Sequence, residues 1–295
     1  MNENVTSPKV LKALMSRYGI APLKRFGQNF LIDGNIADNI ANAAVPKDAC
    51  ALEIGPGFGA LTGRLLKRSS MLAAYEIDAG LAAALREIYA DAPFFYLFHK
   101  DFLKAELEQD LKSLTGDRPL YIAANLPYYI TSPCILKLLT SKLNIKMLTV
   151  MVQLEVAERL CAPAGSRQYG ALSAAAGFYA ESKMLMRVSA SCFYPRPDVA
   201  SAVVQMKKRE QTGAGADAYL KTVKALFAMR RKTVKSNLRQ NFGLDMQTAQ
   251  SVLEAAGVDE NSRAEMLGVA DFEHLSTVLE RHGVLKMDNE IITIE

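Results

Sequence analysis

Residues Ala51 to Leu66 read ALEIGPGFGALTGRLL: a short apolar run, a glycine-rich turn and a segment with helical periodicity. Gly55, Gly57 and Gly59 occupy alternate positions in the turn. Glycine admits positive φ and close ligand approach, so backbone N–H groups at a helix start can face a bound molecule. Because the turn is tighter than the G-x-G-x-x-G of dinucleotide sites, it gives less reason to expect a pyrophosphate.

Short apolar runs alternate with helical patterns from Ala49 to about Leu160, which is typical of repeated βα units. The expected strands are Ala51–Ile54, Met71–Glu76, Phe94–Phe98, Leu120–Ala124 and Met147–Gln153. Right-handed crossovers then predict an α/β fold with an open parallel sheet and helices on both faces. Two further strands, Phe178–Val188 and Val199–Lys207, are expected to form a hairpin at the sheet edge.

A change of composition predicts a second domain. The stretch QTGAGAD, Gln211–Asp217, is small, polar and glycine-rich, as expected of a linker, and the remainder has helical patterns. We therefore expect one domain, built on the sheet, over residues 1–210 and a helical domain over 211–295.

The amino-acid composition argues against a membrane protein, a secreted protein and a metal-binding protein. Half of the 295 residues are apolar, and no apolar run approaches the roughly 18 residues of a membrane span. The first residues lack the apolar core of a signal peptide, so a soluble cytoplasmic protein is expected, with no membrane partner. The four cysteines are far apart and there are only three histidines, so we expect no disulfide framework and no metal site.

Two acidic residues follow the glycine turn at successive strand ends. Glu76 ends the second expected strand, where a carboxylate meets the ribose hydroxyls of an adenosine cofactor. Asp101, after the third strand, could accept a hydrogen bond from an adenine amino group. Glu53 could serve the amine of a methionine moiety or only the fold. The alternative is that the glycines merely turn the chain and the acids cap helices.

The sequence Asn125-Leu126-Pro127-Tyr128 follows the fourth expected strand, at the sheet edge where ligands of such folds bind. An adenine amine is a poor nucleophile because its lone pair is delocalised into the ring. The Asn125 side-chain oxygen and the Leu126 carbonyl could each accept one of its N–H groups, while Pro127 holds Leu126 extended. Tyr128 offers a stacking face for the base. The motif predicts methyl transfer from a sulfonium, by positioning and desolvation; the alternative is a simple turn.

Positive charge is concentrated in two segments although the formal net charge is only +4. Residues 1–32 carry five basic residues and one acid, and residues 219–242 carry no acid and seven basic residues: Lys221, Lys224, Arg230, Arg231, Lys232, Lys235 and Arg239. If the second segment is largely helical, five of these form one stripe suited to RNA phosphates. The alternatives are a solvated face, or a break at Arg230-Arg231 that misaligns the stripe.

With these motifs assembled, the chain resembles the ribosomal RNA adenine N6,N6-dimethyltransferases, more closely those of the bacterial small subunit. The resemblance covers nearly the whole chain and rests on RFGQNFLID, EIGPGFGALT, YEID, the Asp101 segment, NLPYYI, SRQYGALS, FYPRPDVASAVV and AMRRKTVKSNL. It implies a Rossmann-like S-adenosylmethionine-dependent methyltransferase sheet with a smaller all-helical C-terminal domain.

The resemblance also implies roles for individual residues. Gln28, Asn29 and Leu31 match the segment that packs over the cofactor; Gly55, Glu76, Asp101 and Asn125 match other cofactor positions, and Gly57 lies in the same turn. Phe193 matches an aromatic that covers the target base opposite Tyr128, although it could be a core residue. Arg196 and Asp198 depart from the common pattern of that loop, which affects RNA contacts rather than chemistry.

The substrate implied by the resemblance is a pair of neighbouring adenosines in the hairpin loop near the 3′ end of 16S rRNA, each dimethylated. The partner is then the small ribosomal subunit, during its assembly, and the enzyme is expected to be monomeric. One alternative is a large-subunit rRNA adenine methyltransferase of the macrolide-resistance type. Another is a factor that mainly assists ribosome assembly. A DNA adenine methyltransferase fits less well, because too few residues follow Gln211 for a target-recognition domain.

Overall fold

The computed structural model describes residues 5–22, 28–210 and 215–285. Contacts divide them into two units: one holds the described residues of 1–157 and 181–208, the other those of 158–180 and 209–295. Residues 158–180 thus group with the C-terminal helices. The predicted domain division at residue 210 remains an expectation, and residues 211–214 of the predicted linker lie outside the described residues.

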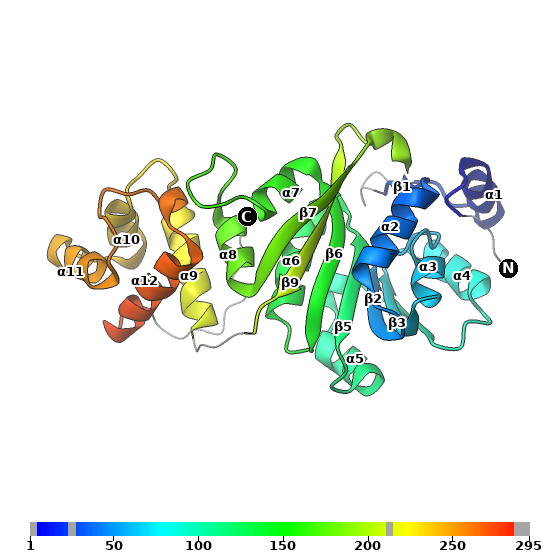
Figure 1. Cartoon of the computed structure of the whole chain (residues 1–295), viewed down its shortest axis with the longest axis horizontal. Coiled ribbons are helices and arrows are strands. Elements are labelled where there is room, and N and C mark those ends of the chain that lie inside the picture. Colours follow the sequence, from blue (N-terminus) through cyan, green and yellow to red (C-terminus); the bar gives the residue numbers. More distant parts are fainter. Residues whose placement is uncertain (1–4, 23–27, 211–214, 286–295) are drawn as a thin grey trace. The chain divides into compact units, whose positions relative to one another are not determined.

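The first unit is built on a mixed seven-stranded sheet within the described residues, in the order β4-β3-β2-β5-β6-β9-β7 (Figure 1). Its strands are β2 (Ala49–Ile54), β3 (Ser69–Glu76), β4 (Phe95–His99), β5 (Leu120–Asn125), β6 (Ile145–Gln153), β7 (Ala180–Val188) and β9 (Ser201–Lys208). The first five are parallel to one another, which confirms the predicted parallel strands. Strand β9 pairs antiparallel with β6.

Helical segments precede the first strand and connect the later ones, as expected of βα units. They are α1 (Pro8–Tyr18), α2 (Gly34–Ala44), α3 (Thr62–Leu66), α4 (Ala79–Ile88), α5 (Leu107–Thr115), α6 (Thr131–Thr140) and α7 (Leu154–Leu160), with the 3-10 turns η2 (Phe102–Lys104), η3 (Tyr128–Ile130) and η4 (Ala190–Cys192). Side chains of Asp33 and Asp78 cap α2 and α4 by accepting the backbone N–H of Ile36 and Leu81. These caps fix where the two helices begin.

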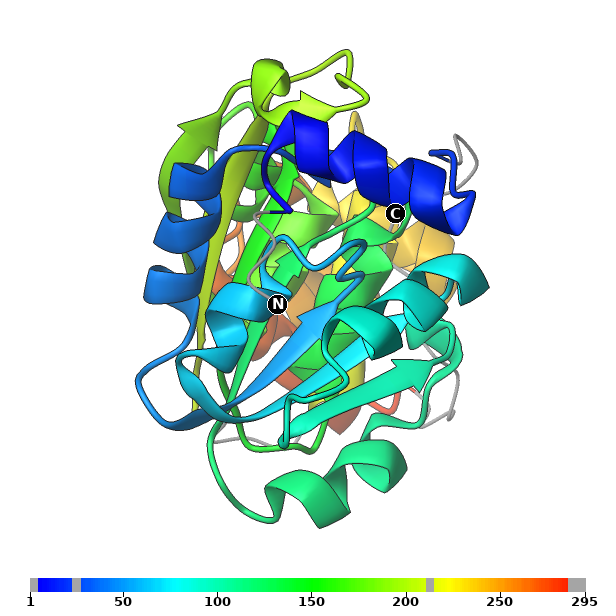
Figure 2. The ribbon, with the colours of Figure 1, turned by 90° about the vertical axis from the view of Figure 1, so that its right-hand side faces the viewer.

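Both faces of the sheet are buried. Ala51, Ala123 and Met151 lie on one face, where they pack in a core cluster with α2 and α3. Leu52 and Ile122 alternate with them and therefore lie on the opposite face, yet they are also fully buried. Figure 2 shows α2 (blue) lying along one side of the strands. The continuous apolar character of these strands follows from burial on both faces.

A separate two-stranded ribbon lies beside the main sheet. Strand β1 (Phe30–Leu31) pairs antiparallel with β8 (Phe193–Tyr194), so that Phe30 is opposite Tyr194 and Leu31 is opposite Phe193. Helix α1 packs on Phe30, Phe58 and Leu81 through Leu11 and Leu14. Figure 2 shows α1 (dark blue) across the end of the sheet. Residues far apart in sequence are thereby brought to one edge of the sheet.

The second unit is helical in its described C-terminal part, as predicted. It contains α8 (Ala171–Tyr179), α9 (Ala216–Phe227), α10 (Val234–Phe242), α11 (Met246–Ala256), the 3-10 turn η5 (Ala264–Met266) and α12 (Val269–Arg281). Its core is aromatic: Tyr219 stacks on Phe178 with ring centroids 4.1 Å apart, and Phe227 stacks on Phe272 at 5.9 Å. The Tyr219 hydroxyl donates to the carbonyl of Ala174 at 2.9 Å.

Two sequence predictions need correction. The strand predicted from Phe178 begins at Ala180, because Phe178 and Tyr179 complete α8 and Phe178 packs on Tyr219. The basic segment 219–242 is two helices, α9 and α10, separated by residues 228–233. The break considered at Arg230-Arg231 is therefore confirmed, and no single helical stripe spans the segment.

Candidate functional site

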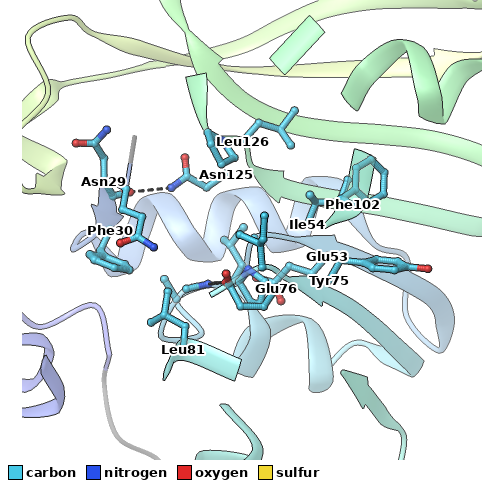
Figure 3. A pocket seen from close by; sticks show the side chains of 18 of the residues that line it. Asn29, Phe30, Glu53, Ile54, Tyr75, Glu76, Leu81, Phe102, Asn125 and Leu126 are labelled. Carbon is cyan, nitrogen blue, oxygen red and sulfur yellow. Dashed lines mark hydrogen bonds between the residues drawn. The ribbon is translucent and has the colours of Figure 1, made fainter. Parts of the chain in front are cut away.

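A cavity opens at the carboxyl ends of β2, β3 and β5, the edge where the sequence places its motifs (Figure 3). Most residues predicted to bind a cofactor or a target base line it: Gln28, Asn29, Leu31, Gly55, Gly57, Glu76, Asp101, Asn125, Leu126, Pro127 and Tyr128. The structure therefore brings together one site from separate parts of the chain.

The glycine turn wraps closely around the carboxylate of Glu76. Gly57 adopts φ 60°, and a Cβ added there would lie 3.1 Å from the Phe30 ring. Its backbone N–H donates to Glu76 Oε2 at 3.1 Å, while the backbone N–H of Asp78 donates to Oε1 at 2.9 Å. Each oxygen keeps a lone pair for a further donor, so the carboxylate can accept from a vicinal diol.

Two buried carboxyl groups differ in their ionisation. Burial raises the pKa of Glu76 to about 6, while backbone N–H groups of Asp78 and Gly57 oppose the rise. Burial raises the pKa of Glu53 to about 8, although the Thr62 hydroxyl donates to it at 2.7 Å. At neutral pH Glu76 is therefore mainly ionised and Glu53 mainly protonated. The cavity thus presents a charged acceptor beside a neutral acid.

Asp101 serves the fold and lines the cavity. Its Oδ1 accepts the backbone N–H of Leu103 at 2.9 Å and so caps the short turn η2. The next residue, Phe102, is buried and also lines the cavity. Lys137 of α6 supports this turn by donating to the carbonyls of Leu103 and Ala105 at 2.8 and 2.6 Å. The capping alternative therefore holds for Asp101 together with its place in the site.

Asn125 ends β5 with its amide held in one orientation. Its Nδ2 donates to the backbone carbonyl of Asn29 at 3.1 Å, the contact drawn in Figure 3. With the nitrogen held there, Oδ1 is the end of the amide that can accept from a substrate. Leu126 N–H donates to the carbonyl of Met151 at 3.1 Å, which anchors the peptide after Asn125 to β6. The Tyr128 hydroxyl lies 3.0 Å from Ser201 Oγ.

The N-terminal segment contributes more to the cavity than the sequence suggested. Besides Gln28, Asn29 and Leu31, the lining includes Phe30 and, from the α1 region, Val5 and Leu11. Phe30 lies between two predicted positions and could have been found by adjacency, but the α1 residues carried no recognisable signal. Residues 25–27 of the predicted RFGQNFLID motif lie outside the described residues.

Phe193 lies elsewhere in this structure. It is only 3% exposed, pairs with Leu31 in the β1–β8 ribbon and packs in the core cluster with Val188. It is not among the cavity-lining residues, whereas its neighbour Tyr194 is 36% exposed. A role for Phe193 at the target base stays a prediction.

The seven basic residues proposed for RNA have different environments. Lys224, Arg231, Lys232 and Arg239 are exposed, whereas Lys235 donates to Glu260 at 2.5 Å with its side chain only 18% exposed. Arg230 donates to the carbonyl of Tyr169 at 3.3 Å. Lys221 also has an interaction within the protein. The absence of acidic residues from 219–242 therefore suggested more unpaired positive charge than the structure shows. Lys235 is paired with Glu260, which lies 25 residues further along the chain.

Neither metal ligation nor membrane spanning finds support in the described residues. They contain no cluster of three or more His, Cys, Asp or Glu side chains placed to hold a metal ion. None of their helices is long and apolar enough to cross a membrane.

Comparison with known proteins agrees with the site. Residues 23–280 match the family model described as ribosomal RNA adenine dimethylase. The chain is 39% identical to ribosomal RNA small subunit methyltransferase A of Geobacillus kaustophilus, over 95% of this chain and 98% of that protein. The protein of the same name from Pelotomaculum thermopropionicum is 40% identical, over 92% and 96% of the two chains.

Solved structures show the same fold. The 23S rRNA methyltransferase ErmE superposes with a TM-score of 0.65 at 26% identity, covering 85% of this chain and all of that one. A dimethyladenosine transferase from Plasmodium falciparum superposes with a TM-score of 0.73 at 23% identity, covering 86% of this chain and 98% of that one. The mixed α/β sheet described above is therefore the Rossmann-like fold of RNA methyltransferases.

Proposed function

Because the chain belongs to the ribosomal RNA adenine dimethylase family, we propose that it transfers methyl groups from S-adenosylmethionine to the N6 amines of two adjacent adenosines in 16S rRNA. The observation that carries the proposal is the orientation of Asn125. Its amide nitrogen is engaged by Asn29, and its oxygen is left to accept from a substrate in the cavity that Glu76 and Asp101 line. The substrate is proposed to be the loop of the 3′-terminal hairpin of the small subunit.

The residues present fit the adenosine part of the cofactor. Glu76 offers two oxygens, held by Gly57 and Asp78, to the ribose hydroxyls. Asp101 keeps a second carboxyl oxygen for the adenine amino group, since only Oδ1 accepts from Leu103. When bound, S-adenosylmethionine supplies a methyl group activated by a sulfonium centre. Phe30, packed over Gly57, helps to exclude water from the turn.

The target amine is prepared by the Asn125 loop. In the first transfer, Asn125 Oδ1 and the Leu126 carbonyl each accept one N–H of the adenine amine, which turns its lone pair out of the ring plane. In the second transfer the monomethylated amine has one N–H left, which one of the two oxygens accepts. Pro127 holds the loop through its own carbonyl, which accepts from Ile130 N–H and from the Thr131 hydroxyl, both at 3.2 Å. Tyr128 stacks on the base while its hydroxyl stays with Ser201. No general base is needed to activate the amine, since positioning supplies the rate.

Small-subunit rRNA is preferred to large-subunit rRNA as the substrate. Two relatives are named for the small subunit. They are 39% and 40% identical to this chain, and the match covers almost their whole length. The similarity to the 23S rRNA methyltransferase is lower, at 26% identity. We propose that the partner is the small ribosomal subunit and that the protein acts in the cytoplasm as a monomer.

Transfer of labelled methyl groups tests the proposal. The protein is incubated with labelled S-adenosylmethionine and, separately, with unmethylated small subunits, large subunits and DNA, and the label is mapped. We expect dimethyladenosine at two adjacent positions in the 3′-terminal hairpin loop of 16S rRNA. Label found only in large subunits or in DNA would overturn the substrate assignment.

A further inference from the structure

Asp110, on the outer helix α5, makes two polar contacts with residues that line the cavity. The hydroxyl of Tyr75 donates to Asp110 Oδ2 at 3.1 Å, and Lys100 Nζ donates to Oδ1 at 2.5 Å. The Asp110 side chain is only 10% exposed, and Tyr75 is 1% exposed. A buried phenol and a lysine therefore share one carboxylate.

The two residues that Asp110 holds directly precede the two cofactor acids. Tyr75 is followed by Glu76 at the end of β3, and Lys100 is followed by Asp101 after β4. The backbone N–H of Lys100 also donates to the carbonyl of Glu76 at 3.1 Å, which joins these strand ends. One side chain on α5 thus contacts the residue that precedes each of the two acids.

Aromatic packing extends the same arrangement toward the adenine side of the cavity. The Tyr75 ring stacks on Phe98 with centroids 5.0 Å apart and meets Phe102 edge-on at 5.5 Å. Phe102 follows Asp101 and is 4% exposed. Because the hydroxyl of Tyr75 is tied to Asp110, its ring cannot rotate away from Phe102 without leaving a buried donor unpaired.

We propose that Asp110 is a positioning residue for the adenosine part of the cofactor, an inference that rests on the proposed function. It holds Tyr75 and Lys100 so that Glu76 and Asp101 face one ligand. It also engages the ammonium group of Lys100, which itself lines the cavity and is 49% exposed. Without Asp110, that ammonium is attracted to Asp101 and Glu76 and competes with the cofactor hydroxyls and amine for them.

Glu108 provides a matched control on the same helix. Its Oε1 accepts from the Ser141 hydroxyl at 3.0 Å and from the Lys142 N–H at 2.9 Å, so it also ties α5 to another segment. Neither Ser141 nor Lys142 lines the cavity. Glu108→Ala therefore removes a tether of α5 whose hydrogen-bond partners lie outside the cavity.

The experiment measures S-adenosylmethionine affinity by calorimetry for the wild type, Asp110→Ala, Asp110→Asn and Glu108→Ala. We expect Asp110→Ala to weaken binding about tenfold or more and Glu108→Ala to change it less than about twofold. Asp110→Asn keeps an acceptor for Tyr75 but loses the charge that holds Lys100, so its affinity should be intermediate. Adding Lys100→Met to Asp110→Asn should restore affinity, because the competing ammonium is gone.

Kinetics separate positioning from general destabilisation. For Asp110→Asn the KM for S-adenosylmethionine should rise while kcat at saturating cofactor stays near that of the wild type. Two results would overturn the role of Asp110: an equal loss of affinity in Asp110→Asn and Glu108→Ala, or no recovery of affinity when Lys100→Met is added. Both can be measured even if Asp110→Ala fails to fold. In either case, binding of S-adenosylmethionine by the wild type would remain consistent with the proposed function. Failure of the wild type to bind S-adenosylmethionine would overturn the proposed function itself.

Discussion

At the scale of single residues, what the site can bind depends on which atoms of each polar side chain already hydrogen-bond within the protein. Asn125 illustrates this, because its hydrogen bond to Asn29 assigns the amide nitrogen to the protein and the oxygen to a substrate. Glu76 accepts two backbone N–H groups and remains mainly ionised, while Glu53, with one hydroxyl donor, has its pKa raised by burial to about 8. These neighbouring acids thus differ in ionisation first because of burial, which raises both pKa values, and then because Glu76 accepts more backbone donors that oppose the rise.

Asn125→Ala should separate chemistry from binding. The variant loses one of the two acceptors for the adenine amine, so methyl transfer should fall by about 10²–10³, by analogy with the loss of one oxyanion-hole donor. Affinity for the small subunit should stay near that of the wild type, because phosphate contacts dominate binding. Single-turnover transfer at saturating cofactor measures the first effect. A rate within about threefold of wild type would contradict the role given to Asn125.

Glu53→Gln should change how stability depends on pH. The pKa of Glu53 is raised from 4.5 to about 8 in the folded protein, so the native state binds this proton more tightly than the unfolded chain. The wild type therefore loses stability as the pH rises through that interval, by an amount on the order of a few kcal/mol. Glutamine stays neutral and can still accept from Thr62.

Calorimetric unfolding without cofactor, from about pH 6 to about pH 9, measures this difference. The Tm of Glu53→Gln relative to wild type should rise with pH up to about pH 8 and level off above it. A constant difference between the two proteins would show that Glu53 holds no more protons in the folded state than in the unfolded chain over that range.

At the scale of elements, the strands were the most predictable part of the chain. The five predicted parallel strands are present because apolar runs bounded by turns leave few alternatives once both sheet faces are buried. The end of α8 was missed because aromatic residues favour strands, and only the packing of Phe178 on Tyr219 shows why they stay helical. The β1–β8 ribbon was not predicted, since two-residue strands have no periodicity to detect.

The parts of the candidate site that carry a recognisable sequence motif were predictable. The glycine turn, the acids and the Asn125 loop all meet at one cavity, as expected from their places at strand ends. Contacts between distant segments were not predictable, because nothing local marks them. Examples are Asp110 with Tyr75, 35 residues apart, and Lys235 with Glu260, 25 residues apart.

Gly57→Ala should show that the turn works through its close approach to β1. Alanine at φ 60° is strained, by about 1–2 kcal/mol, and its Cβ would meet the Phe30 ring at 3.1 Å. Displacing Phe30 should weaken S-adenosylmethionine binding in addition to lowering Tm. Gly243→Ala is the control, because Gly243 has φ 67° with nothing within 4 Å of an added Cβ.

Both alanine variants should lose stability through backbone strain, measured by calorimetric unfolding, and Gly57→Ala should lose more because of its contact with Phe30. Only Gly57→Ala should lose cofactor affinity. An equal affinity in the two variants would mean that the close approach of Gly57 to Phe30 does not matter for binding.

At the scale of the whole molecule, the residues assigned to the cofactor and those assigned to RNA phosphates belong to different units. Glu76, Asp101 and Asn125 lie in the unit built on the sheet, and the basic residues of α9 and α10 lie in the helical unit. Variants in the helical unit can therefore test RNA binding without altering the cofactor cavity. The choice of residues must follow their environments, since Lys235 is committed to Glu260.

Neutralising Lys224, Lys232 and Arg239 together should weaken binding to small subunits and flatten its salt dependence. These three residues are exposed, and each phosphate that is no longer neutralised should reduce the slope of log K against log salt by about 0.7–0.9. Cofactor affinity should equal that of the wild type, because the cavity lies in the other unit.

Lys235→Met is the contrasting variant. It breaks a partly buried ion pair, so it should lower Tm yet leave the salt slope nearly unchanged. Titrations at several salt concentrations decide between the two roles: if the triple variant keeps the wild-type slope, its charges are a solvated face, and phosphate binding must then rest on other basic residues.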